Sequence, residues 1–132
     1  MTAHGSPLAA WHALVRAPDP QALQAILADD VVFHSPVVHT PQMGKALTAM
    51  YLGAALRLLA VDSFRYVREV TGPRDAALEF VVELDGITVN GVDMIAWNEA
   101  GLITDFKVLL RPLKAVHIVH QKMAELLGRA PK

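Results

Sequence analysis

Residues 87–111 read ITVNGVDMIAWNEAGLITDFKVLLR, and this pattern predicts two strands joined by a turn. Apolar residues dominate both halves, and the Asn-Glu-Ala-Gly turn ends in Gly101, which can adopt a positive φ. One acid, Asp93, lies in the first half. A carboxylate within an apolar strand must face water, find hydrogen-bond partners or keep its proton. Which of these applies to Asp93 bears directly on what the protein does.

The elements around this hairpin predict an α+β fold. Residues 76–84 alternate apolar and polar side chains, as in a half-buried strand, and Asp85-Gly86 favours a tight hairpin turn. Asp19 followed by Pro20 is typical of a helix start. The other predicted elements are helices over residues 7–15, 20–28 and 45–60, strands over 31–35 and 63–71, a loop over 37–43, and a helix that begins at Pro112. This order indicates a cone-shaped curved antiparallel sheet wrapped around N-terminal helices, with a C-terminal helix and a hollow suited to a ligand.

Composition narrows the class of protein. The 132 residues suit one compact domain, and a hydrophobic content of 53% leaves apolar surface for a pocket or a subunit interface. The net charge of −1 and the absence of a basic stripe argue against nucleic-acid binding. The absence of cysteine excludes disulfides, thiolate metal sites and a cysteine nucleophile. Because neither a signal peptide nor a membrane-spanning stretch is visible, we expect a soluble cytoplasmic protein with no membrane partner.

Several motifs resemble the nuclear-transport-factor-2-like superfamily, which includes ketosteroid isomerases and SnoaL-like polyketide cyclases. They are ADDVVFHSP at residues 28–36, Gly44 before the third helix, GVDMI at residues 91–95 and GLI at residues 101–103. The resemblance covers nearly the whole chain as one domain, residues 1–132, and implies a cone-like α+β fold. It also implies a homodimer packed through the sheet. This fold hosts many functions, so the resemblance alone does not choose among them.

The resemblance to ketosteroid isomerases extends to individual positions. Asp93 precedes Gly101 by eight residues, the spacing of that family's acid, which stays protonated and donates to an oxyanion. Ser35 occupies the position of the family's aspartate base, and Trp11 that of its tyrosine donor. One of three catalytic positions is therefore kept. The Arg-x-Asp pattern of limonene epoxide hydrolases, which resemble this fold, does not occur, so that mechanism is disfavoured.

The sequence does not identify one residue that replaces the family's aspartate base. His34 is the ionisable residue nearest to Ser35 in the sequence. Strand alternation points its side chain away from that of Ser35, unless Pro36 twists the end of the strand. Alternatively, His34 is a structural or interface residue, and the same alternation disfavours a Ser-His-Asp triad. His117 and His120 are spaced i, i+3, yet no carboxylate follows at a useful spacing, so we expect no metal site.

We derive two hypotheses for function. In the first, the chain is a small enzyme that isomerises, cyclises or dehydrates a small apolar molecule without a cofactor. Asp93 is then the acid, and His34 or a water held by Ser35 is the base. In the second, it is a non-catalytic ligand-binding or dimerisation domain. Asp93 is then satisfied by a neighbouring strand residue or at a dimer interface, and the hollow is filled by Trp11, Trp97 and Phe106. The candidate ligand-binding residues are Trp11, Ser35, Tyr51, Phe80, Trp97 and Phe106, although aromatic residues are also common core residues.

A homodimer is expected under both hypotheses. The outer face of the predicted sheet keeps apolar residues among its charges, namely Val67, Val81 and either Val108 or Leu109. Asp105 and Lys107 are also expected on this outer face because they alternate with Phe106.

Overall fold

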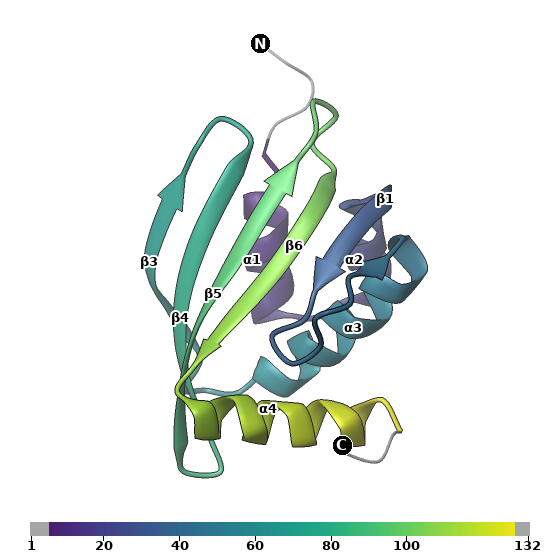
Figure 1. Cartoon of the computed structure of the whole chain (residues 1–132). Coiled ribbons are helices and arrows are strands. Elements are labelled where there is room, and N and C mark those ends of the chain that lie inside the picture. The colour runs from purple at the N-terminus through teal and green to yellow at the C-terminus, as the bar shows by residue number, and fades with distance from the viewer. Residues whose placement is uncertain (1–5, 129–132) are drawn as a thin grey trace.

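A computed structural model describes residues 6–128 of the chain (Figure 1). Six strands form one sheet in the order β2-β1-β6-β5-β4-β3. The elements are α1 Leu8–Arg16, α2 Pro20–Ala25, β1 Leu27–His34, β2 Gln42–Met43, α3 Lys45–Leu59, β3 Arg65–Thr71, β4 Asp75–Leu84, β5 Ile87–Trp97, β6 Ile103–Arg111 and α4 Leu113–Leu126. The predicted α+β fold with a curved sheet is confirmed. One pair departs from the antiparallel arrangement, because β1 runs parallel to β6.

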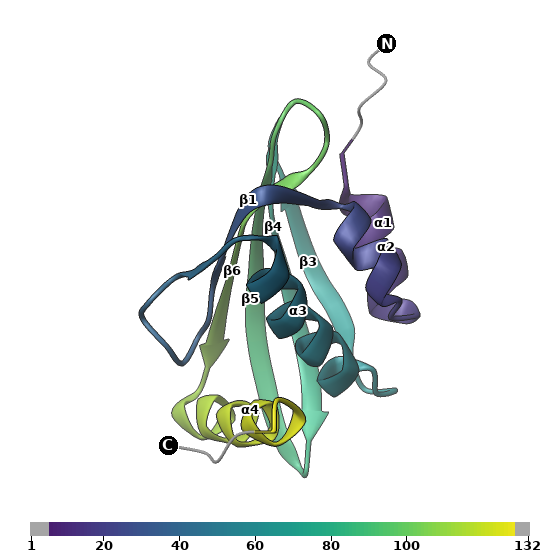
Figure 2. The same cartoon turned by 90° about the vertical axis from the view of Figure 1, so that its right-hand side faces the viewer.

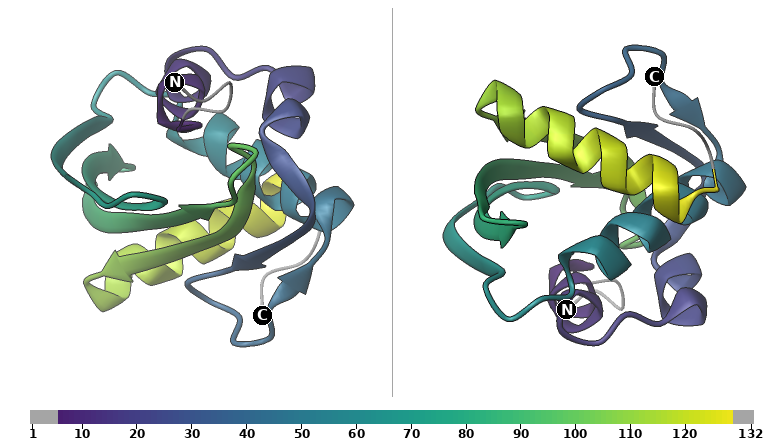
Figure 3. Two further views of the ribbon diagram at one scale, coloured as in Figure 1. Left: turned by 90° about the horizontal axis from the view of Figure 1, so that it is seen from above. Right: turned by 90° about the horizontal axis from the view of Figure 1, so that it is seen from below.

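The sheet wraps around the N-terminal helices (Figure 2). Helices α1, α2 and α3 lie on its concave side (Figure 3). Helix α4 crosses the strands at the end of the cone opposite α1 and α2 (Figure 2). Strand alternation places apolar residues of β4 and β5 on this concave side, where Leu78, Phe80, Val89 and Ile95 are buried. No helix within residues 6–128 is long and apolar enough to cross a bilayer.

The β4–β5 hairpin follows directly from the sequence. Its pairing runs in continuous register from Asp75 opposite Ala96 to Leu84 opposite Ile87. Asp85 and Gly86 both have positive φ, 51° and 78°, as a tight two-residue turn between twisted strands requires. Asp93 therefore lies at a fixed place in the middle of the sheet, opposite Leu78 of β4 and Val108 of β6.

Two predicted boundaries near the N-terminus are wrong. The helix expected over residues 20–28 ends at Ala25, and the strand expected to begin at residue 31 begins at Leu27. Leu27 pairs with Ile103, whose N–H donates to the carbonyl of Ile26 at 2.8 Å. Pairing with β6 thus determines the conformation here. Strand pairing also overrides the sequence prediction at β2: this short strand pairs with β1, although the sequence predicted a loop there.

The buried side chains form two clusters. The larger lies between α1–α3 and the sheet and contains Trp11, Phe33, Trp97 and Phe106. The smaller lies between the sheet and α4 and is centred on Phe80. The sheet comes close to this ring at Gly91, where a Cβ atom would overlap the Phe80 ring and contact Leu110. Between these clusters lies the hollow that the cone shape predicts.

Candidate functional site

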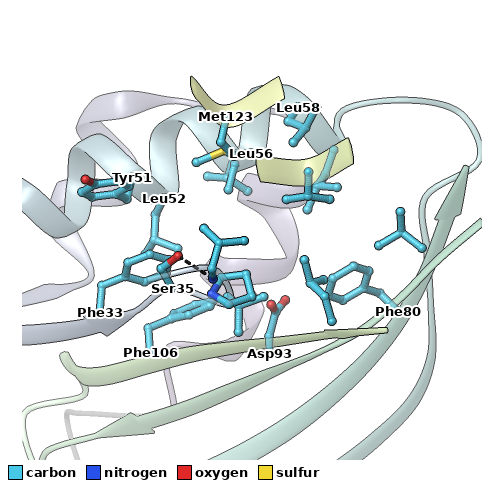
Figure 4. Close-up of a pocket in the computed structure, with 18 of the residues that line it drawn as sticks. Phe33, Ser35, Tyr51, Leu52, Leu56, Leu58, Phe80, Asp93, Phe106 and Met123 are labelled. Atoms are coloured by element: carbon cyan, nitrogen blue, oxygen red, sulfur yellow. Dashed lines mark hydrogen bonds between the residues drawn. The ribbon is translucent and has the colours of Figure 1, made fainter. Parts of the chain in front are cut away.

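A cavity of about 660 Å³ opens between the inner face of the sheet, α3, α4 and the segment after β1 (Figure 4). This volume lies within the range of known small-molecule sites. Most of the wall is aliphatic or aromatic, and it includes Phe33, Leu52, Leu56, Phe64, Phe80, Phe106, Leu110 and Met123. Such a wall suits an apolar ligand with few polar atoms.

Asp93 supplies the carboxylic acid of this cavity. Its neighbours on β5, Val92 and Met94, face the other side of the sheet, so strand alternation turns Asp93 inward. The residue is only 5% exposed, and its carboxyl group points into the cavity near Phe80 and Phe106 (Figure 4). The acid noted in the hairpin sequence therefore faces the hollow rather than water.

A chain of hydrogen bonds holds the Asp93 carboxyl group. The Tyr66 hydroxyl on β3 donates to Asp93 Oδ2 at 2.6 Å, and Trp11 Nε1 on α1 donates to the Tyr66 oxygen at 2.9 Å. Both donors point the same way along the chain, which strengthens each bond. Within residues 6–128, Asp93 Oδ1 has no hydrogen-bond partner, so it is available to a ligand.

Burial controls the protonation of this pair. Desolvation raises the pKa of Asp93 from its ordinary 3.8 to about 7, against the opposing effect of the Tyr66 hydrogen bond. Burial also raises the pKa of Tyr66 well above its ordinary range, with the nearby Asp93 charge adding to the effect. Tyr66 thus remains a hydrogen-bond donor. Asp93 can hold a proton on Oδ1 near neutral pH and present it to the cavity.

Five of the six predicted ligand-binding residues line the cavity: Trp11, Ser35, Tyr51, Phe80 and Phe106. Trp97 does not, because it lies in the buried core between the helices and the sheet. The Ser35 side chain accepts a hydrogen bond from the Val37 N–H at 3.1 Å, a turn contact that uses one of its lone pairs (Figure 4).

The structure does not bring His34 and Asp93 together. His34 is absent from the cavity wall, and its Nε2 lies 2.9 Å from Asp105 Oδ1 on β6. The reason is the alternation of side chains along β1, which sends His34 to the face opposite Phe33. His34 therefore has a hydrogen-bonding carboxylate partner outside the cavity, and we do not assign it the role of base.

Sequence reasoning missed two polar residues of the site. Tyr66 alternates with Arg65 and Val67 on β3, and a buried tyrosine needs a partner for its hydroxyl, which was the available signal. His120 lies on α4 among Val119, Met123 and other cavity-lining residues. Its spacing of three from Met123 places both on one helix face, which was the available signal; from the sequence alone, His120 was considered only as a metal ligand, together with His117. Residues 6–128 contain no cluster of ligating side chains that could hold a metal ion.

Comparison with known proteins places this geometry in a family. The family model described as a SnoaL-like domain matches residues 8–106. The chain belongs to the SnoaL-like family. This agrees with the predicted nuclear-transport-factor-2-like superfamily and its ketosteroid-isomerase-related branch. A comparison with curated proteins gives no match.

Solved structures similar to this SnoaL-like protein agree with that assignment. One is a steroid delta-isomerase from Pseudomonas aeruginosa, with 32% identity, a TM-score of 0.79 and coverage of 92% of this chain and 85% of that chain. Another is an uncharacterized protein with a cystatin-like fold from Silicibacter pomeroyi DSS-3, with 32% identity, a TM-score of 0.78 and coverage of 92% and 82%. A third shows the fold alone: a protein with a ketosteroid isomerase-like fold from Catenulispora acidiphila, solved with trimethylamine, at 17% identity, a TM-score of 0.59 and coverage of 85% and 91%.

Proposed function

We propose that this SnoaL-like protein binds an apolar small molecule that carries an oxygen atom and rearranges it by acid–base chemistry, with Asp93 as the acid. The observation that carries the proposal is a buried carboxyl group that faces an apolar cavity while Tyr66 holds its other oxygen at 2.6 Å. A protonated Oδ1 would then donate to a carbonyl or hydroxyl oxygen of the ligand.

The geometry suits stabilisation of a developing negative charge. When a proton leaves the carbon next to a ketone, charge moves to the ketone oxygen, and a fixed donor at that oxygen lowers the barrier. The apolar walls keep water away, which strengthens this hydrogen bond. Tyr66 and Trp11 act as positioning residues, because they fix the carboxyl group through Oδ2 and leave Oδ1 for the ligand.

Isomerisation is the reaction that we favour. One of the two similar structures at 32% identity is a steroid delta-isomerase, and moving a carbon–carbon double bond into conjugation with a ketone passes through such a charged oxygen. Cyclisation and dehydration could use the same acid. The alternative of a non-catalytic binding domain draws support from Ser35, which leaves this chain without the family's carboxylate base.

The test is turnover of androst-5-ene-3,17-dione, whose conjugated product absorbs in the ultraviolet, together with ligand-induced thermal shift. We expect Asp93→Ala to lower kcat/KM by about 100-fold and Asp93→Asn, which keeps a weaker donor, by about 10-fold or more. Asp30→Asn is the matched control, because Asp30 is an exposed strand aspartate outside the cavity. Equal turnover by all variants would refute the role of Asp93. Binding without turnover by the wild type would favour the non-catalytic alternative.

We also propose that the protein forms a homodimer through the outer face of the sheet. Val70, Met94 and Leu109 are 61%, 44% and 49% exposed there, whereas Val108 of β6 faces the cavity. Some of the charges beside them have partners across strands: Arg68 Nη2 lies 2.9 Å from Glu79 Oε1, and Asp105 Oδ1 lies 2.9 Å from His34 Nε2. A second copy that packs on this face would cover these exposed apolar side chains.

A further inference from the structure

Helix α4 brings a second ionisable group to the cavity opposite Asp93. Its inner stripe consists of Val119, His120, Met123, Ala124 and Leu127, all of which line the cavity. The stripe is apolar except for the imidazole of His120, which is half-buried. In Figure 4 the helix carrying Met123 lies across the cavity from the strand that carries Asp93, so a ligand between them would contact both walls.

None of the other ionisable groups of the wall suits the role of base. They are Tyr51, Tyr66 and Asp93. Phenols ionise only near about pH 10 in water, and burial raises the pKa of Tyr66 further. Asp93 is needed as the acid at the ligand oxygen. His120 is thus the lining side chain whose imidazole nitrogen can accept a proton from the ligand.

The contacts of the histidines distinguish His120 further. His12 Nε2 lies 2.8 Å from Glu69 Oε1, and His34 is paired with Asp105, so both have carboxylate partners outside the cavity. Within residues 6–128, the His120 ring has no hydrogen-bond or ion-pair partner, which leaves its nitrogens available to a ligand. His117, one turn earlier on α4, is exposed and does not line the cavity.

We propose that His120 is the general base of this site and takes the place of the carboxylate missing at Ser35. This inference rests on the proposed isomerase function. A free His120 nitrogen accepts the proton from the carbon between the ketone and the double bond of the substrate. The electron pair of that C–H bond enters the conjugated dienolate, whose oxygen accepts the hydrogen bond from Asp93. The protonated imidazole then returns the same proton to the far carbon of the former double bond, so no co-reactant is consumed.

The test compares His120→Gln with His117→Gln, using androst-5-ene-3,17-dione as substrate and its conjugated product as a binding probe. Glutamine keeps polarity and approximate size but cannot move a proton at neutral pH. We expect His120→Gln to lower kcat by about 100-fold or more while product affinity stays within about threefold of the wild type. His117→Gln should match the wild type in both quantities.

A second variant guards against an effect of misfolding. His120→Ala suits a helix and leaves space for an added base, so imidazole in solution should restore part of its lost turnover, whereas it should not restore Asp93→Ala. Full activity in both His120 variants, with turnover still lost in Asp93→Ala, would overturn this inference and leave the proposed function standing. Absence of turnover in the wild type would refute both.

Discussion

Replacing Asp93 with asparagine should change how the stability of the protein depends on pH. The pKa of this carboxyl group is about 7 in the folded chain and 3.8 when it is solvated, so its proton binds more tightly to the folded state. The resulting stabilisation is present in full below about pH 3.8 and is lost as the pH rises through about 7. Asparagine has the same shape but no proton to lose.

The magnitude follows from the difference between the two pKa values. A shift from 3.8 to about 7 corresponds to about 4 kcal/mol across the full titration. Between about pH 5 and about pH 9, where urea unfolding is practical, about 3 kcal/mol of this amount should be lost. The wild type should therefore lose about 3 kcal/mol relative to Asp93→Asn over that interval.

The assay is urea unfolding of both proteins at several pH values, with the difference in free energy of unfolding plotted against pH. Histidines and exposed acids titrate alike in both proteins and cancel in this difference. Asp30→Asn, an exposed strand aspartate, supplies the control and should give a nearly flat difference. A flat difference for Asp93→Asn would refute the argument, as would a wild type that gains stability relative to Asp93→Asn as the pH rises.

Three further changes test other parts of the structure. Tyr66→Phe removes the donor to Asp93 and the acceptor for the Trp11 N–H, so we expect a loss of about 1–3 kcal/mol in the free energy of unfolding and a still higher pKa of Asp93. An unchanged urea midpoint would contradict this. Gly91→Ala places a methyl group against the Phe80 ring and should cost about 1–3 kcal/mol in the same assay, whereas a neutral effect would show that the ring moves freely. Met94→Lys should convert a dimer into monomers of 14.3 kDa in sedimentation, and a monomeric wild type at micromolar concentration would refute the proposed interface.

The sequence predicts those parts of the fold whose signals are local. The alternation of side chains in residues 76–84 and the Asp85-Gly86 turn were sufficient to predict the β4–β5 hairpin. The continuous pairing of its two strands then fixes the position of Asp93. The start of β1 was not predictable in this way, because pairing with Ile103, far along the chain, converts Leu27 from helix to strand. Local propensity carries no information about such a partner.

In the site, too, local sequence signals identify one residue, whereas contacts between distant parts of the chain bring in its partners. An isolated acid in an apolar strand marks Asp93 from sequence alone, because burial of a carboxylate requires a reason. Its partner Tyr66 lies 27 residues away, and Trp11 lies a further 55 residues from Tyr66, so only the folded sheet and α1 bring them together. Trp97 shares the inward face of β5 with Asp93, yet the packing of α1 and α2 places it in the core beyond the cavity.

The most direct measurement is the distance between Asp93 Oδ1 and the ketone oxygen of a bound ligand. A crystal of the protein with androst-4-ene-3,17-dione, the conjugated product of the proposed reaction, would provide it. Our account predicts that a ketone oxygen lies within about 2.8 Å of Asp93 Oδ1, while the Tyr66 hydroxyl remains on Oδ2. A steroid whose ketone oxygens both lie away from Asp93 would contradict it.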